Sequence, residues 1–144
     1  MFSSVLSFIR SDVKVGIVGS RDYPDPDLVR SFVAALPAGS VVVSGGKGVV
    51  DEEAAAMGRS LGLVVEEHKP EWTRYGLAAG PIRNRKIVAA GLYCLVVFLY
   101  LDVKSKGSRD AIKAAKKAGV PIFIFDQTGN PVVIKDEKQL RMDV

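Results

Sequence analysis

The chain has 144 residues, of which 48% are hydrophobic and 25% charged, with one cysteine and one histidine. This length predicts one globular domain over residues 1–144, whose apolar core needs no disulfide. The single Cys and single His exclude a Cys/His metal cage and Ser-His-Asp or Cys-His catalysis, so we expect no metal and no cofactor.

The net charge of +4 is unevenly distributed along the chain. Residues 1–72 contain 7 Lys/Arg against 10 Asp/Glu, whereas residues 73–144 contain 13 against 6. We therefore expect an anionic partner on the second half: nucleic acid, a membrane surface or a small phosphate compound. No apolar run reaches the ~18 residues of a membrane span, and residues 1–10 lack the features of a signal peptide. These patterns predict a cytoplasmic protein, and of the three anionic partners we favour the small phosphate compound and expect no membrane partner.

Strands and helices are predicted to alternate along the chain. After a docking segment (1–12), β-branched and aromatic runs predict strands at 13–18, 41–43, 63–67, 92–100 and 121–125. Helical periodicity between them predicts helices at 27–36, 50–61, 81–90 and 108–118. The fold class is α/β, a Rossmann-like three-layer sandwich with a mostly parallel sheet of about five strands. Residues 126–144 are expected to form a C-terminal hairpin or edge strand and tail.

Polar, glycine-containing loops follow four of the predicted strands. In an open parallel sheet such loops meet at one edge, where ligands bind. Glycine lets backbone N–H groups approach a phosphate, helix N-termini present free N–H groups, and arginine adds bidentate donors. The candidate residues for binding a phosphorylated ligand are Gly19, Ser20, Arg21, Ser44, Gly45, Gly46, Lys47, Asp51, Arg83, Asn84, Arg85, Gly107, Ser108, Arg109 and Asp110.

Two common nucleotide fingerprints are absent. The P-loop pattern would need Gly at position 41 and Ser or Thr at 48, where the chain has Val41 and Gly48. A G-x-G-x-x-G run is also missing. The sequence therefore excludes a P-loop NTPase and disfavours an ordinary NAD dehydrogenase.

Helical spacing ranks the candidates in the third long helix. Arg83 shares a face with Ile87, and Asn84 shares one with Val88, so periodicity favours Arg83 and Asn84 over Arg85 at the ligand edge. Pro81 is expected at the first helical position.

Other candidate residues each have two possible roles. Asp51 could accept hydrogen bonds from ribose hydroxyls or fix the glycine loop. Ser108 could cap its helix, with Asp110 as a first-turn acid, or both could contact ligand. Trp72 could stack on a base or cover the core, and we favour cover.

Four segments resemble the SLOG superfamily, specifically its small bacterial and phage members related to LOG and to the DNA-processing protein Smf/DprA. They are GSRDYPD (19–25), VVSGGKGVVDEEA (42–54), AGPIRNRKIV (79–88) and SKGSRDAIKAAKKAGVPI (105–122). The resemblance covers residues 13–126 and implies a Rossmann-like domain that binds nucleotides or ADP-ribose-like compounds. It also implies a homo-oligomer, most simply a dimer. Residues 92–101 and the amphipathic N-terminal segment offer apolar surface for such an interface.

The resemblance to LOG enzymes implies an alternative activity, hydrolysis of the N-glycosidic bond of nucleoside 5′-monophosphates. Residues 107–110 are similar to the end of the LOG motif, with Asp110 near the position of its Glu, and Arg85-Lys86 is similar to the LOG Arg-Lys pair. The resemblance to Smf/DprA implies a DNA-binding module instead. We do not favour that alternative, because the sequence has no helix-turn-helix, RNP or zinc-finger signature.

Overall fold

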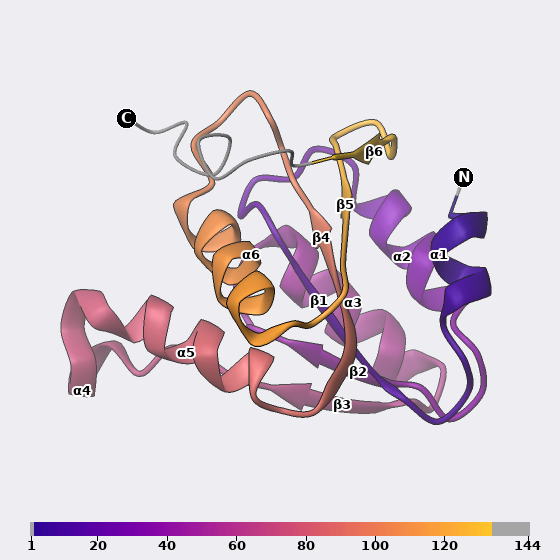
Figure 1. Cartoon of the computed structure of the whole chain (residues 1–144), viewed down its shortest axis with the longest axis horizontal. Helices are drawn as coiled ribbons and strands as arrows, with labels where there is room; N and C mark the ends of the chain where they lie inside the picture. Colours follow the sequence, from indigo (N-terminus) through magenta and orange to yellow (C-terminus); the bar gives the residue numbers. More distant parts are fainter. Residues whose placement is uncertain (1, 134–144) are drawn as a thin grey trace.

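A six-stranded sheet forms the centre of the protein in a computed structural model that describes residues 2–133 (Figure 1). The strand order is β3-β2-β1-β4-β5-β6, with all pairs parallel except β5–β6. This confirms the predicted α/β, Rossmann-like class and its antiparallel edge strand. The strands are β1 (Lys14–Gly19), β2 (Val41–Ser44), β3 (Val64–Glu67), β4 (Leu92–Phe98), β5 (Ile122–Phe125) and β6 (Pro131–Val132).

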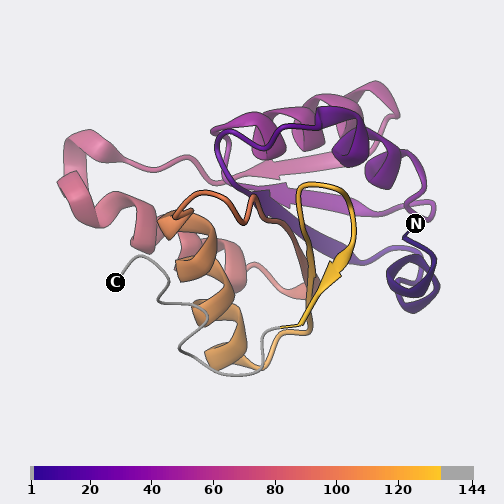
Figure 2. The same ribbon diagram turned by 90° about the horizontal axis from the view of Figure 1, so that it is seen from above.

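Helices cover both faces of the sheet, giving three layers (Figure 2). One face packs against α1, α2 and α3, and the other against α5 and α6. The helices are α1 (Ser3–Phe8), α2 (Pro26–Ala34), α3 (Val49–Ser60), α4 (Trp72–Tyr75), the 3₁₀ turn η1 (Gly76–Ala78), α5 (Ala79–Val88) and α6 (Lys106–Ala118). Within the described residues, no helix combines the length and apolar character needed to cross a bilayer.

Strand β4 lies in the middle of the sheet and explains the long apolar run in the sequence. Its alternate side chains enter two different cores: Val96 and Phe98 pack under α1, α2 and α3, whereas Leu95 and Val97 pack under α5 and α6. All four are fully buried. A parallel strand covered on both faces has no solvent side and therefore no polar alternation.

The sheet reverses its strand order between β1 and β4. The chain builds β2 and β3 on one side of β1 and then crosses to build β4 and β5 on the other. The loops that follow β1 and β4 consequently diverge and leave a crevice at the carboxyl edge of the sheet. The fold therefore places the predicted ligand edge at this switch point.

The N-terminal segment docks onto its own chain. Phe2, Val5 and Ile9 are each less than 8% exposed and belong to the core beneath α1, α2 and α3. The sequence predicts that this segment and residues 92–101 offer apolar surface to a partner subunit. That expectation is wrong for most of this surface, because the chain buries it internally. The homodimer remains a prediction without that surface as its basis.

Two predicted helix starts are wrong. Helix α5 begins at Ala79, two residues before Pro81, and α6 begins at Lys106 with Ser105 at the N-cap. Ser108 is therefore inside the first turn of α6 and is not its cap, and Asp110 follows in the second turn. Helices α1, α4 and η1 were not predicted, because each is too short to show a helical period.

Candidate functional site

A cavity of about 930 Å³ lies at the carboxyl edge of the sheet. Residues from β1, α3, α5 and the loop between β4 and α6 line it, so it occupies the crevice at the switch point. Eleven of the fifteen predicted site residues line this cavity: Gly19, Ser20, Arg21, Lys47, Asp51, Arg83, Asn84, Gly107, Ser108, Arg109 and Asp110.

Arg83 and Asn84 connect α5 to two segments that are distant in sequence, the loop after β2 and the start of α6. Arg83 Nη1 donates a hydrogen bond of 2.8 Å to the carbonyl oxygen of Gly45, after β2, and Arg83 Nε donates one of 2.9 Å to Asn84 Oδ1. Asn84 Nδ2 then donates to the Gly107 carbonyl at 3.0 Å and to Asp110 Oδ2 at 2.9 Å. Asn84 is only 2% exposed. Buried, fully engaged polar side chains of this kind hold a site in one geometry.

Gly45 lets this network form. A Cβ atom at Gly45 would overlap Arg83 Nη1 and come within 2.6 Å of Asp51 Oδ2. Only a residue without a side chain therefore leaves room for the arginine and the carboxylate next to this backbone. The glycine is required here for close packing of functional side chains.

Asp51 is a buried carboxylate at the start of α3. It is 4% exposed, the Lys47 N–H donates to its Oδ2 at 3.5 Å, and its Oδ1 has no hydrogen-bond partner among the described residues. Burial raises the pKa of Asp51 to about 7, although the nearby charge of Arg83 acts in the opposite direction. Burial likewise lowers the pKa of Arg83. Of the two roles predicted for Asp51, the structure supports contact with the glycine loop.

Ser20 and Ser105 join the two loops that diverge at the switch point. Their hydroxyl oxygens lie 2.5 Å apart, and the Tyr100 N–H donates to Ser20 Oγ at 2.8 Å. Ser105 adopts a left-handed conformation with φ of 49°, which is unusual for a residue with a side chain. The contact with Ser20 holds this strained residue at the N-cap of α6.

The first turn of α6 and several cations give the cavity a positive character. Gly107 is exposed, and a Cβ atom added there would meet nothing within 4 Å. The partial positive charge of the helix N-terminus adds to the side-chain charges. Three acidic lining residues (Asp22, Asp51 and Asp110) are outnumbered by six basic ones: Arg21, Lys47, Arg83, Lys106, Arg109 and Lys113.

Four predicted site residues do not line the cavity: Ser44, Gly45, Gly46 and Arg85. Ser44 and Gly45 are buried, Gly45 against Arg83 and Asp51, and Gly46 packs beside Lys69 and Glu67. Arg85 is exposed on the outer side of α5, as its helical position requires. Periodicity therefore placed Arg83 and Asn84 correctly, whereas the SLOG resemblance pointed to Arg85.

Three exposed large apolar residues line the cavity but were not among the predicted site residues: Trp72, Leu77 and Val103. Trp72 is 45% exposed and does not cover a core, so the predicted role as cover is wrong. The other role considered for Trp72 from the sequence, stacking on a base, remains a prediction. Within the described residues, no group of three His, Cys, Asp or Glu side chains is arranged to hold a metal ion.

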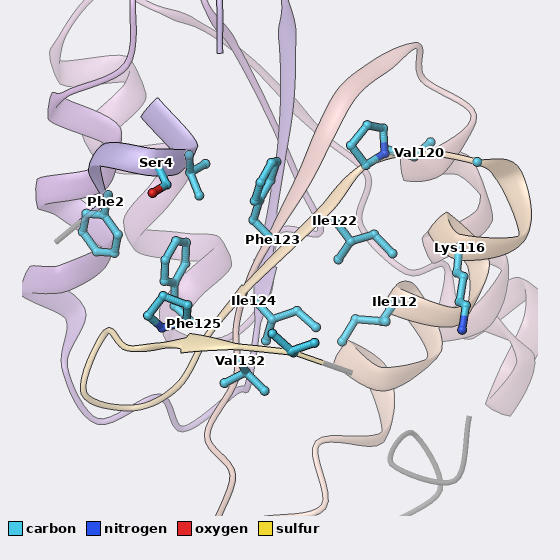
Figure 3. Close-up of a pocket in the computed structure, with 15 residues that line it drawn as sticks. Phe2, Ser4, Ile112, Lys116, Val120, Ile122, Phe123, Ile124, Phe125 and Val132 are labelled. Atoms are coloured by element: carbon cyan, nitrogen blue, oxygen red, sulfur yellow. The ribbon is translucent and has the colours of Figure 1, made fainter. Parts of the chain in front are cut away.

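A second cavity, of about 690 Å³, surrounds β5 (Figure 3). Phe2, Phe123 and Phe125 line one side, and Ile112 and Lys116 of α6 line the other. Its lining residues are mostly apolar, with Lys116 as the one charged lining residue among those described. It has no set of convergent polar groups that would orient a ligand, and we therefore place the candidate site at the carboxyl edge.

Comparison with known proteins finds a phage relative. The chain is 34% identical to the "Gene 61 protein" of Mycobacterium phage D29 over 122 residues, which cover 78% of this chain and 95% of that protein. No family model matches the sequence. No solved structure matches it either.

Proposed function

The chain belongs to the family of the Gene 61 protein of Mycobacterium phage D29, and we propose that it binds a nucleotide or nucleotide-derived phosphorylated ligand, of the ADP-ribose type, in the cavity at the carboxyl edge. The main support for this proposal is the hydrogen-bond network of Arg83 and Asn84. It holds the segments after β2 and β4 beside one electropositive cavity. The resemblance of four segments to the SLOG superfamily supports the same ligand class.

The phosphate is proposed to lie between Arg83 and the first turn of α6. Arg83 uses Nη1 and Nε for the Gly45 carbonyl and Asn84, which leaves Nη2 for the ligand. Gly107 provides open backbone at the helix N-terminus, where N–H groups bind anions. Charge-assisted bonds from a guanidinium to a phosphate are stronger than neutral ones, so Arg83 supplies the largest single contribution.

Calorimetry against AMP, ADP-ribose, ribose 5-phosphate and adenosine tests the proposal. We expect the three phosphorylated compounds to bind and adenosine to bind far more weakly. Arg83→Gln should weaken AMP binding roughly 10- to 100-fold, the range for loss of a hydrogen bond to a charged group. The matched control is Arg85→Gln, since Arg85 lies two residues away on the same helix but outside the cavity. Absence of both heat and thermal shift with millimolar AMP and ADP-ribose would reject the proposal.

A second candidate function is hydrolysis of the N-glycosidic bond of nucleoside monophosphates. Asp110 favours it, because its carboxylate is oriented by Asn84 in the same cavity. A carboxylate there would stabilise positive charge developing on the sugar while water replaces the departing base. Chromatography of the AMP incubations for free adenine decides between binding and turnover, and Asp110→Asn should abolish any release.

A further inference from the structure

Several exposed apolar side chains line the polar cavity. Seven large apolar residues are exposed among those described, and three of them, Trp72, Leu77 and Val103, line this cavity. Leu77 is 96% exposed. Single apolar residues scattered over a surface need no explanation. Three exposed apolar residues that line one cavity with buried charged groups indicate a binding site for an apolar part of a ligand.

The segment that carries Trp72 and Leu77 projects from the body of the protein. Helix α4 and η1 lie at the far end of α5, away from the sheet (Figures 1 and 2). The Trp72 ring passes close to the start of α5, since a Cβ atom added at Gly80 would lie 3.8 Å from Trp72 Cη2. We call Trp72 and Leu77, with Val103 from the loop between β4 and α6, the apolar rim. Because Trp72 is supported but not buried, it offers a flat surface to the cavity.

Lys47 links the apolar rim to the glycine loop. Its ammonium group lies 5.7 Å from the centre of the Trp72 ring, and its own N–H is the one that Asp51 accepts. A cation at this distance marks an accessible aromatic face with an ordered neighbour. An exposed contact of this kind is weaker than a nucleobase stacked on an aromatic side chain, so a base can replace it.

We propose that Trp72 stacks on a planar ring of the ligand, so that the site selects nucleotides over simple sugar phosphates. This inference rests on the proposed function and assigns its second half: Arg83 and the α6 N-terminus hold the phosphate, and the apolar rim holds the base. The cavity volume of about 930 Å³ accommodates both groups at once. Stacking is tolerant of base identity, because every base has a π-face, so AMP, GMP and CMP should all bind.

Trp72 is the only tryptophan in the chain, so its fluorescence reports directly on the apolar rim. AMP should quench the Trp72 emission on binding, whereas ribose 5-phosphate should bind with little change in emission. Trp72→Ala should weaken AMP binding roughly 10-fold, as expected for loss of one stacked base, and leave ribose 5-phosphate affinity unchanged. Trp72→Phe should restore most of the AMP affinity, because it returns an aromatic face. A matched control is Leu61→Ala, an exposed apolar residue outside the cavity.

The outcomes separate this inference from the proposed function. If Trp72→Ala weakens both ligands equally, or leaves AMP binding intact, the stacking role is wrong while phosphate binding stands. If Trp72→Leu binds AMP as well as Trp72→Phe does, the rim provides only apolar contact and the selection for a planar ring is rejected. If neither ligand binds the wild-type protein, the proposed function and this inference fail together.

Discussion

The two cavities of this protein differ in how their walls are built. The cavity at the carboxyl edge has buried polar side chains that include Asn84, which bonds to the distant Gly107 carbonyl, and Asp51, which accepts from the Lys47 N–H. The cavity around β5 has walls of Phe and Ile that belong to the two cores (Figure 3). Burying polar groups costs free energy that apolar walls do not require. The buried polar side chains of the first cavity are therefore those expected of a ligand site, whereas the apolar cavity reflects incomplete packing.

Enlarging the apolar cavity should give the largest loss of stability and leave ligand binding unaffected. Ile112 is 2% exposed and packs in the core beneath α5 and α6. Ile112→Ala should lower the free energy of unfolding by about 2–4 kcal/mol, the usual cost of such a truncation. Urea denaturation measures this loss, and calorimetry at a temperature where the variant is folded should return the wild-type AMP affinity. A large drop in affinity would mean that the two cavities are coupled.

Changing Gly45 should affect both stability and binding, because this glycine is part of the polar cavity's support. Gly45→Ala places a methyl group against Arg83 Nη1 and Asp51 Oδ2. We expect a loss of about 1–3 kcal/mol from overpacking, together with loss of AMP binding as Arg83 is displaced.

Gly107→Ala is the matched control for this substitution. It should leave stability unchanged or slightly raised, since nothing lies within 4 Å of the new methyl group. Thermal unfolding of both variants tests the comparison, and equal destabilisation would contradict the packing argument.

The difference between local sequence patterns and contacts of distant segments explains which features the sequence could predict. Strand β4 and the two faces of α5 follow from local patterns, since continuous apolar character and a 3.6-residue period survive in any tertiary context. The choice of Arg83 and Asn84 over Arg85 came from that period alone. These features are local in sequence, so one chain was enough to predict them.

Features that depend on contacts between distant segments were not predictable. The burial of Asp51 requires the close approach of Gly45, six residues earlier, and of Arg83, on another helix. Ser108 fits a cap by sequence, but Ser20 holds Ser105 in that position instead. Trp72 lies in a short helix whose exposure depends on the segment projecting from the body. In each case tertiary contact overrode the local preference.

The smallest expected effect concerns Asp51 and changes with pH. Because burial raises the pKa of Asp51 to about 7, the folded protein binds a proton that the unfolded chain releases at a lower pH. Stability from this group is therefore present at low pH and is lost as pH rises through about 7. Between pH 6 and pH 8 the wild type should lose about 1 kcal/mol relative to Asp51→Asn, which cannot ionise. Denaturation of both proteins at the two pH values measures the difference.

Ionisation of Asp51 should also affect the anion affinity of the polar cavity. A charged carboxylate beside Arg83 repels an incoming anion, so wild-type binding should be tighter at pH 6 than at pH 8. Sulfate is the appropriate probe, because its own charge is constant over this range, unlike that of a phosphate monoester. Asp51→Asn should bind sulfate with nearly equal affinity at both pH values. An equally steep dependence in the variant would show that another group controls the anion, and would leave Asp51 with only its contact to the Lys47 backbone.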